Sequence, residues 1–136
     1  MLRERAEAEG LGNIILPGLA DVTRLPFGND SFDSASTAET LEHVPEHDTA
    51  AAEFARVLRP DGWLVGTVPA GPRQWSDWDD WADHQRRYRP GEMAALLRDA
   101  GLNPAVKVYG WPPFRPGSVI VWPTNRRIGL FGLSAP

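Results

Sequence analysis

Residues 58–69 read LRPDGWLVGTVP, a helix stop followed directly by an apolar run. Pro60 and Gly62 end the preceding helical pattern, and the run from Trp63 to Val68 shows no polar alternation. An unbroken apolar run that is bounded by Gly62 and Pro69 is typical of a parallel strand covered on both faces of a sheet. We therefore predict that residues 63–68 form a central strand.

Two segments beside this strand have the periodicity of amphipathic helices. In our prediction Asp48 caps the earlier helix, whereas the later one has Pro90 near its first position and Gly101 at its end. The apolar residues that share one face are Ala51, Phe54, Ala55 and Leu58 in the first helix and Met93, Leu96, Leu97 and Ala100 in the second. Each helix is expected to bury one stripe against the sheet.

Shorter segments complete the predicted secondary structure. Residues 2–9 are strong helix formers that end at Gly10. Further strands are predicted at residues 13–16, with an extension over 19–22, and at residues 32–37, 106–109 and 119–122. Strands that alternate with one-sided helices indicate an α/β fold with a mainly parallel sheet, in which ligands bind beyond the carboxyl ends of the strands. We place this domain at residues 1–110 and a Pro-rich tail at residues 111–136.

Composition limits the function. The chain has 136 residues, 42% hydrophobic side chains, no cysteine and a net charge of −4. Without cysteine there is no disulfide or thiolate metal site, and without a basic stripe nucleic acid is not the expected partner. The charged first residues do not make a signal peptide, and no apolar run approaches the roughly 20 residues that cross a bilayer. We expect a cytoplasmic protein with no membrane association.

Three further segments carry a pattern in a fixed order. They are DVTRLPF at residues 21–27, SFD at 31–33 leading to ETLEHV at 39–44, and LRPDGWL at 58–64. The set resembles the class I S-adenosylmethionine-dependent methyltransferases (type 11) over most of the chain. Asp61 departs from the family pattern, which has glycine at that turn. The resemblance implies a Rossmann-like sheet and methyl transfer from S-adenosylmethionine to a small-molecule acceptor.

The resemblance also implies which residues hold the cofactor. Asp21 would accept a hydrogen bond from the adenine amine, and the backbone N–H of Val22 would donate to the ring. Ser36, Thr37 and Ala38 have small side chains that would let the backbone approach the methionine half. Two other interpretations stay open: Asp21 caps the turn that follows it, and residues 36–38 are a closely packed strand end.

Glu39, Glu42 and His43 form the sharpest local pattern. On a helix these positions project from one face, so two carboxylates and an imidazole would converge. With His84 as a distant fourth ligand they predict a site for magnesium, manganese or zinc. The arrangement is similar to the Glu-x-x-Glu-His of small-RNA 2′-O-methyltransferases and ubiquinone-pathway O-methyltransferases, which implies a metal that positions a hydroxyl acceptor. In the alternative, Glu42 and His43 bond locally to backbone or arginine.

Residues 80–90, DWADHQRRYRP, are similar to a Gly-His-x-Arg-Arg-Tyr stretch that lies over the active site in bacterial members of the family. Asp83 stands where the family has glycine. His84 or Tyr88 would act as a general base toward the acceptor, and His43 is a further candidate to face it. The alternative is a surface charge cluster that Tyr88 anchors.

Trp75, Trp78 and Trp81 stand three apart and predict one aromatic stripe on a helical turn. Such a stripe serves packing, or on the acceptor side it suits an apolar or ring-shaped substrate. The opposite face is expected to stay wet, because it carries three aspartates, Asp77, Asp79 and Asp80.

The family's Gly-x-Gly-x-Gly loop does not follow a strand in this sequence, and Gly10-Leu11-Gly12 follows a helix instead. The resemblance implies an N-terminally truncated fold that lacks the first two strands and the first helix. We expect a fragment of a larger product or a start upstream, with two alternatives, a homodimer through the exposed sheet edge and a decayed paralogue. The isolated chain is expected to bind S-adenosylmethionine weakly or not at all. The rival function is a degenerate, non-catalytic methyltransferase-like interaction module.

Overall fold

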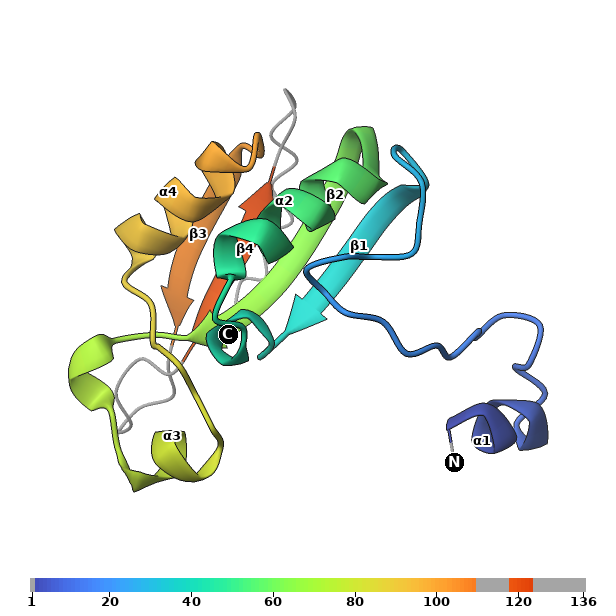
Figure 1. Cartoon of the computed structure of the whole chain (residues 1–136), viewed down its shortest axis with the longest axis horizontal. Helices are drawn as coiled ribbons and strands as arrows, with labels where there is room; N and C mark the ends of the chain where they lie inside the picture. The colour runs from blue at the N-terminus through green and yellow to red at the C-terminus, as the bar shows by residue number, and fades with distance from the viewer. Residues whose placement is uncertain (1, 110–117, 124–136) are drawn as a thin grey trace, which may run out of the picture.

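The computed structural model describes residues 2–109 and 118–123, and its centre is a four-stranded sheet (Figure 1). The strands are β1 (Phe32–Ala38), β2 (Leu58–Pro69), β3 (Pro104–Tyr109) and β4 (Ser118–Pro123), in the order β1-β2-β4-β3. β1 pairs with β2 in parallel, and β4 is antiparallel to both β2 and β3. β1, β2 and β3 therefore run in one direction and β4 alone runs the other way, which confirms the mainly parallel α/β sheet.

The helices are α1 (Leu2–Ala8), α2 (His47–Val57), α3 (Asp77–Trp81) and α4 (Pro90–Asp99), with short 3-10 turns η1 (Leu41–His43) and η2 (Pro72–Gln74). α2 and α4 lie over the same face of the sheet, and α3 stands off below its edge in Figure 1. The core between helices and sheet contains Ala51, Phe54, Leu58, Leu64, Val68, Met93 and Leu97. In the part of the chain that is described, every helix is too short or too polar to cross a membrane.

The boundaries of α4 follow the sequence signals, whereas α2 differs from the prediction at both ends. Leu58, predicted on the buried face of that helix, is the first residue of β2. α4 has Pro90 at its start and Gly101, with a φ of 88°, just beyond its end, as predicted. α2 begins earlier than predicted, with Glu46 at the N-cap. Asp48 lies inside the first turn, where its charge favours the positive end of the helix dipole.

β2 is covered on one face only by the described helices. Leu64 and Val68 are buried under α2 and α4, whereas Trp63 and Val65 are 38% and 39% exposed. The prediction of a strand covered on both faces is wrong for this structure, because α2 and α4 lie together on one side of it. The side chains of β2 do not alternate between polar and apolar, but they do alternate between buried and exposed.

No strand forms between residues 13 and 22, so that prediction is also wrong. Ile14, Leu16 and Leu19 are 77%, 81% and 102% exposed. The backbone N–H groups of Ile14 and Ile15 donate locally to the carbonyl of Leu11. A strand needs a neighbour for its ladder, and among residues 2–109 and 118–123 no strand lies beside this segment.

Candidate active site

The site lies where β1 and β2 end. η1 follows the carboxyl end of β1, and residues 83–89, which come after α3, lie across it. The backbone N–H of Gln85 donates to the carbonyl of Glu42 at 2.7 Å. The Arg86 guanidinium donates to the carbonyls of Val44 and, at 3.0 Å, Pro45. These bonds join two segments that are far apart in sequence at the edge where parallel sheets hold ligands.

Glu42 is a buried carboxylate that receives no hydrogen bond from the described residues. Its side chain is 0% exposed, and neither Oε1 nor Oε2 has a hydrogen-bond partner among the described residues. Burial raises the pKa of this carboxyl above its ordinary value, and the nearby charge of Glu39 adds to the rise. A buried polar group that receives no bond destabilises a fold, so its retention points to a ligand or a functional role.

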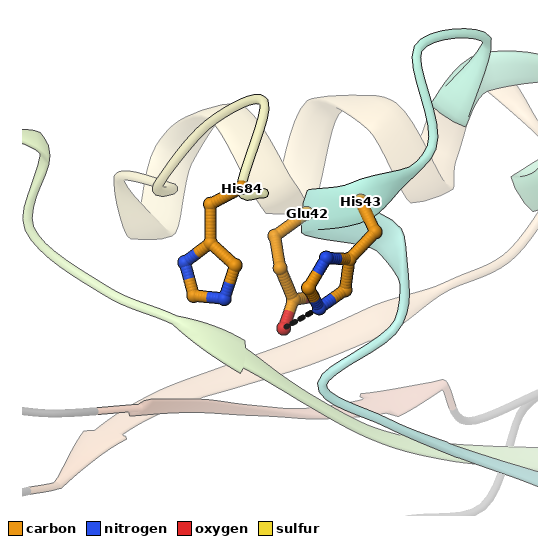
Figure 2. Close-up of side chains that lie close together, drawn as sticks. All are labelled: Glu42, His43 and His84. Carbon is orange, nitrogen blue, oxygen red and sulfur yellow. Dashed lines mark ion pairs between the residues drawn. The ribbon is translucent and has the colours of Figure 1, made fainter. Parts of the chain in front are cut away.

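Two imidazoles face this carboxylate (Figure 2). His43 Nε2 lies 3.9 Å from Glu42 Oε1, and the rings of His43 and His84 meet edge-on with centroids 4.7 Å apart. One donor atom from each residue lies within 4.8 Å of the other two. We call Glu42, His43 and His84 the Glu-His-His cluster. It unites three of the four residues that the sequence predicted as metal ligands.

Glu39 is not part of the cluster. From the sequence it was expected on one helical face with Glu42 and His43, but the helix is only the 3-10 turn η1, and it starts at Leu41. Glu39 precedes that turn, has a φ of 46° and is exposed. The i, i+4 geometry behind the prediction does not exist here, because the chain leaves β1 through a left-handed residue.

Asp79 holds His84 in place, a role that the sequence did not predict. His84 Nδ1 lies 2.8 Å from Asp79 Oδ1, and the same oxygen accepts a bond of 2.6 Å from Arg87 Nε. Asp79 is 0% exposed, so its predicted place on a wet face is wrong. Burial acts to raise its pKa, but the hydrogen bonds from Arg87, His84 and Ser76 outweigh burial and hold the pKa well below its usual range. The spacing Ser76-x-x-Asp79, a capping box, was the signal for an inward carboxylate.

Tyr88 lies outside the cluster and anchors the loop. Its side chain is 2% exposed, and its hydroxyl donates to the carbonyl of Leu41 at 3.1 Å and lies 2.8 Å from His47 Nδ1. Burial raises the pKa of Tyr88 to about 12. A general base must first lose its proton, and this environment opposes that loss. The structure favours the anchoring role over the catalytic one for this residue.

The residues predicted to hold the adenine lie on an exposed turn. Asp21 Oδ1 accepts bonds from the backbone N–H and the hydroxyl of Thr23, at 2.8 Å and 2.7 Å. These bonds lower the Asp21 pKa. Val22 is half-buried against the core. Asp21 thus caps its own turn, which was the alternative interpretation, and in this arrangement its side chain still faces solvent.

The residues predicted for the methionine half lie at the carboxyl end of β1. Ser36 and Ala38 are exposed, whereas Thr37 is half-buried and pairs with Gly66 of β2. A Cβ at Gly66 would stand 2.8 Å from Thr37 Cγ2 and 3.0 Å from the Thr37 carbonyl oxygen. β1 and β2 therefore approach closely here, and the small residues bring the strand end next to η1 and the Glu-His-His cluster.

The three tryptophans do not form one stripe that packs against the core. Only Trp78 and Trp81 lie in α3, where they are 63% and 76% exposed and their rings are in contact, with centroids 4.7 Å apart and planes tilted by 33°. Trp75 lies before the helix and donates from Nε1 to Asp80 Oδ1 at 2.9 Å. The Trp78–Trp81 pair therefore faces solvent on the same short helix whose Asp79 reaches inward to His84.

A family profile described as a methyltransferase domain matches residues 1–66 of the chain. Methyltransferase GfsG of Streptomyces halstedii is 44% identical over 63 residues, 46% of this chain and 23% of that protein. Demethylmenaquinone methyltransferase of Mycobacterium tuberculosis is 47% identical over 98 residues, 68% of this chain and 40% of that protein. The chain thus spans less than half the length of these relatives.

The fold is similar to that of a solved geranyl diphosphate methyltransferase in complex with S-adenosylmethionine. The TM-score is 0.74 at 17% identity, over 90% of this chain and 62% of that one. The ordered motifs, the sheet order and these similarities agree: the chain belongs to the class I S-adenosylmethionine-dependent methyltransferases.

Proposed function

We propose that this chain takes part in methyl transfer from S-adenosylmethionine to a small-molecule acceptor. The observation that carries the proposal is the Glu-His-His cluster beside the carboxyl ends of β1 and β2. Bound S-adenosylmethionine supplies an electrophilic methyl group on a sulfonium. Ser36 to Ala38 would border its methionine half and Asp21 with Val22 its adenine. His43 or His84 would take the proton that an acceptor hydroxyl or amine loses, and the loop at residues 83–89 would limit access of water.

Two features support a small, ring-containing acceptor. The name of the mycobacterial relative contains such an acceptor, demethylmenaquinone. In this chain the exposed Trp78–Trp81 pair lies on α3, and the same helix is bonded through Asp79 to His84. Flat aromatic side chains near a proton acceptor suit a flat acceptor ring.

The non-catalytic alternative is less well supported. A decayed module has no reason to keep a carboxylate that is fully buried and receives no hydrogen bond. Replacement of Glu42 by an apolar residue would be expected early in such decay, because the buried charge destabilises the fold. The hydrogen bond between the loop at residues 83–89 and η1 points the same way.

The proposed cofactor site can be tested by a method that detects weak binding. A ¹⁵N-labelled chain is titrated with S-adenosylhomocysteine to millimolar concentration, and amide shifts are followed. We expect shifts at residues 21–22 and 36–38 and none in α4, with calorimetry showing no micromolar binding. Shifts that appear elsewhere and spare residues 21–22 and 36–38 would contradict the proposed cofactor site.

We further propose that the Glu-His-His cluster can hold a divalent cation. Its donors are one carboxylate and two imidazoles, which suit zinc or manganese, and Asp79 supplies the carboxylate that ligating histidines commonly bond with their other nitrogen. An ion there would supply positive charge to Glu42 and would draw an acceptor oxygen toward the cluster.

Thermal unfolding with and without Zn²⁺ or Mn²⁺ tests this cation. At about 100 times its dissociation constant a bound ion stabilises the fold by about 2.7 kcal/mol. We expect the ion to raise the Tm of the wild type and of Glu39→Gln, but not of Glu42→Gln or His84→Gln. If Glu39→Gln abolishes the shift as well, the three-residue site is wrong and the four-residue site predicted from sequence is restored.

A further inference from the structure

Asp79 is surrounded by hydrogen-bond donors. Its Oδ2 accepts from the backbone N–H of Ser76 at 2.9 Å and from the Ser76 hydroxyl at 3.1 Å. Its Oδ1 accepts from Arg87 Nε at 2.6 Å and lies 2.8 Å from His84 Nδ1. A backbone N–H and a guanidinium can only donate, and a carboxylate that is paired with a permanently charged arginine can only accept. The position of the proton between Asp79 and His84 is thereby determined.

We infer that Asp79 is a positioning residue that holds His84 in the tautomer protonated at Nδ1, so that Nε2 presents its electron pair to Glu42 and His43. Since Nδ1 must donate to Asp79, the electron pair of the neutral ring can only be on Nε2. Figure 2 shows a ring nitrogen of His84 on the side of the Glu42 carboxylate. In water a histidine side chain favours the opposite tautomer, so the protein has to impose this one.

Further contacts of His84 and Arg87 restrict rotation of the His84 ring. The His84 side chain is 8% exposed, and its backbone N–H donates to the carbonyl of Asp79 at 2.9 Å. Arg87 fixes Asp79 from the other side and also donates to the carbonyl of Ala70, at the end of β2, at 3.2 Å. Arg87 and Asp79 thus link the residue that follows β2, the loop at residues 83–89 and α3, and they hold the His84 ring through Nδ1.

The use that we give to the Nε2 electron pair rests on the proposed function, because a proton from the acceptor or a bound cation would need that pair. The orientation of the His84 ring is independent of the proposed function. The orientation is present with no cofactor or acceptor bound, and it concerns only contacts among the described residues.

The tautomer can be measured directly. The chain has three histidines, so a long-range ¹H–¹⁵N correlation spectrum of the ring nitrogens at pH 8 is simple, and His84→Gln identifies one set of signals. We expect His84 Nδ1 to give the shift of a protonated nitrogen and Nε2 that of an unprotonated one. In Asp79→Ala the ring loses the acceptor for Nδ1, and we expect the proton to move toward Nε2, the position that water favours. Asp77→Ala, on the exposed start of the same helix, should leave the tautomer unchanged.

Two results would overturn the inference. One is a wild-type His84 that carries its proton on Nε2, or on both nitrogens, at pH 8. The other is a folded Asp79→Ala variant with the wild-type tautomer. If Asp79→Ala does not fold, the wild-type spectrum still decides. The expected tautomer with no binding of cofactor or cation would refute the proposed function and leave the role of Asp79 intact.

Discussion

The hydroxyl of Tyr88 donates a hydrogen bond to the backbone carbonyl of Leu41, at a distance of 3.1 Å. Leu41 opens η1 and Tyr88 closes the loop that lies over it, so this buried bond fixes the spacing between the two segments that form the site. Because the carbonyl can only accept, the Tyr88 proton lies on that bond, and His47 Nδ1, 2.8 Å from the hydroxyl, must donate to it. The Tyr88 hydroxyl therefore supplies hydrogen bonds to two polar groups, the Leu41 carbonyl of η1 and the His47 ring of α2.

Tyr88→Phe is expected to destabilise the chain by about 0.5–1.5 kcal/mol, because half-buried His47 Nδ1 loses its partner and the Leu41 carbonyl keeps only the bond from the Val44 N–H. Chemical denaturation measures the loss. In a cycle with His47→Ala the double variant should lose less than the sum of the single losses, since the two side chains share one bond. A loss below about 0.5 kcal/mol for Tyr88→Phe would show that the loop is held by its other bonds.

Glu42→Gln is expected to stabilise the chain, and more so as pH rises. Burial raises the Glu42 pKa above the ordinary value of 4.5, so the unfolded chain ionises first as pH increases. The native state then loses stability from about pH 4.5 upward until the folded pKa is passed. Glutamine does not titrate and escapes this loss. At pH 7.5 we expect a gain of about 1–3 kcal/mol, and at pH 4 almost none.

The control for this prediction is Glu39→Gln, an exposed carboxylate that precedes the same turn. It should change stability by less than about 0.5 kcal/mol at either pH. A difference between Glu42→Gln and wild type that does not vary from pH 4 to pH 7.5 would mean that Glu42 keeps an ordinary pKa and is solvated in solution.

The elements whose signals are local were predictable from the sequence. α4 shows this best, because Pro90, Gly101 and an apolar stripe specify its start, end and buried face within one short segment. The strand predicted at residues 13–16 failed for the opposite reason. Its apolar content is right for a strand, but a ladder depends on a neighbour that can lie anywhere in the chain, and the described residues supply none.

In the candidate site, too, some features were predictable from the sequence and others depend on the fold. Glu42, His43 and His84 were recognisable as residue types, but the turn that removes Glu39 and the bond that joins Asp79 to His84 depend on how the chain leaves β1 and returns after α3. Asp79 looked like one of several surface aspartates. Only the position of Ser76 three residues before it set it apart, and that signal concerns capping, not chemistry.

Gly66→Ala is expected to destabilise the sheet by about 1–3 kcal/mol, because its Cβ would overlap Thr37 Cγ2 and press on the Thr37 carbonyl. Thermal unfolding measures the change. Adding Thr37→Ser, which removes the Cγ2 atom, should restore part of the loss. Gly91→Ala is the matched control, because a Cβ there meets nothing within 4 Å and the position lies in α4. Equal effects at the two glycines would refute the close approach of β1 and β2.

Asp61 and Asp83 stand where the family pattern has glycine, and the structure gives the physical reason for that pattern. Their φ angles are 68° and 57°, in the left-handed region that a side chain disfavours. The conformation costs about 1–2 kcal/mol for a residue with a Cβ, less for aspartate, whereas glycine adopts it freely but gains entropy in the unfolded chain. Asp61→Gly and Asp83→Gly should therefore each stabilise the chain by a net of at most about 0.5 kcal/mol. Denaturant midpoints measure the gain, and Asp99→Gly, at the helical end of α4, should lose stability instead. If all three changes lower the midpoint, the strain at the two left-handed aspartates does not outweigh the entropy that glycine gains in the unfolded chain.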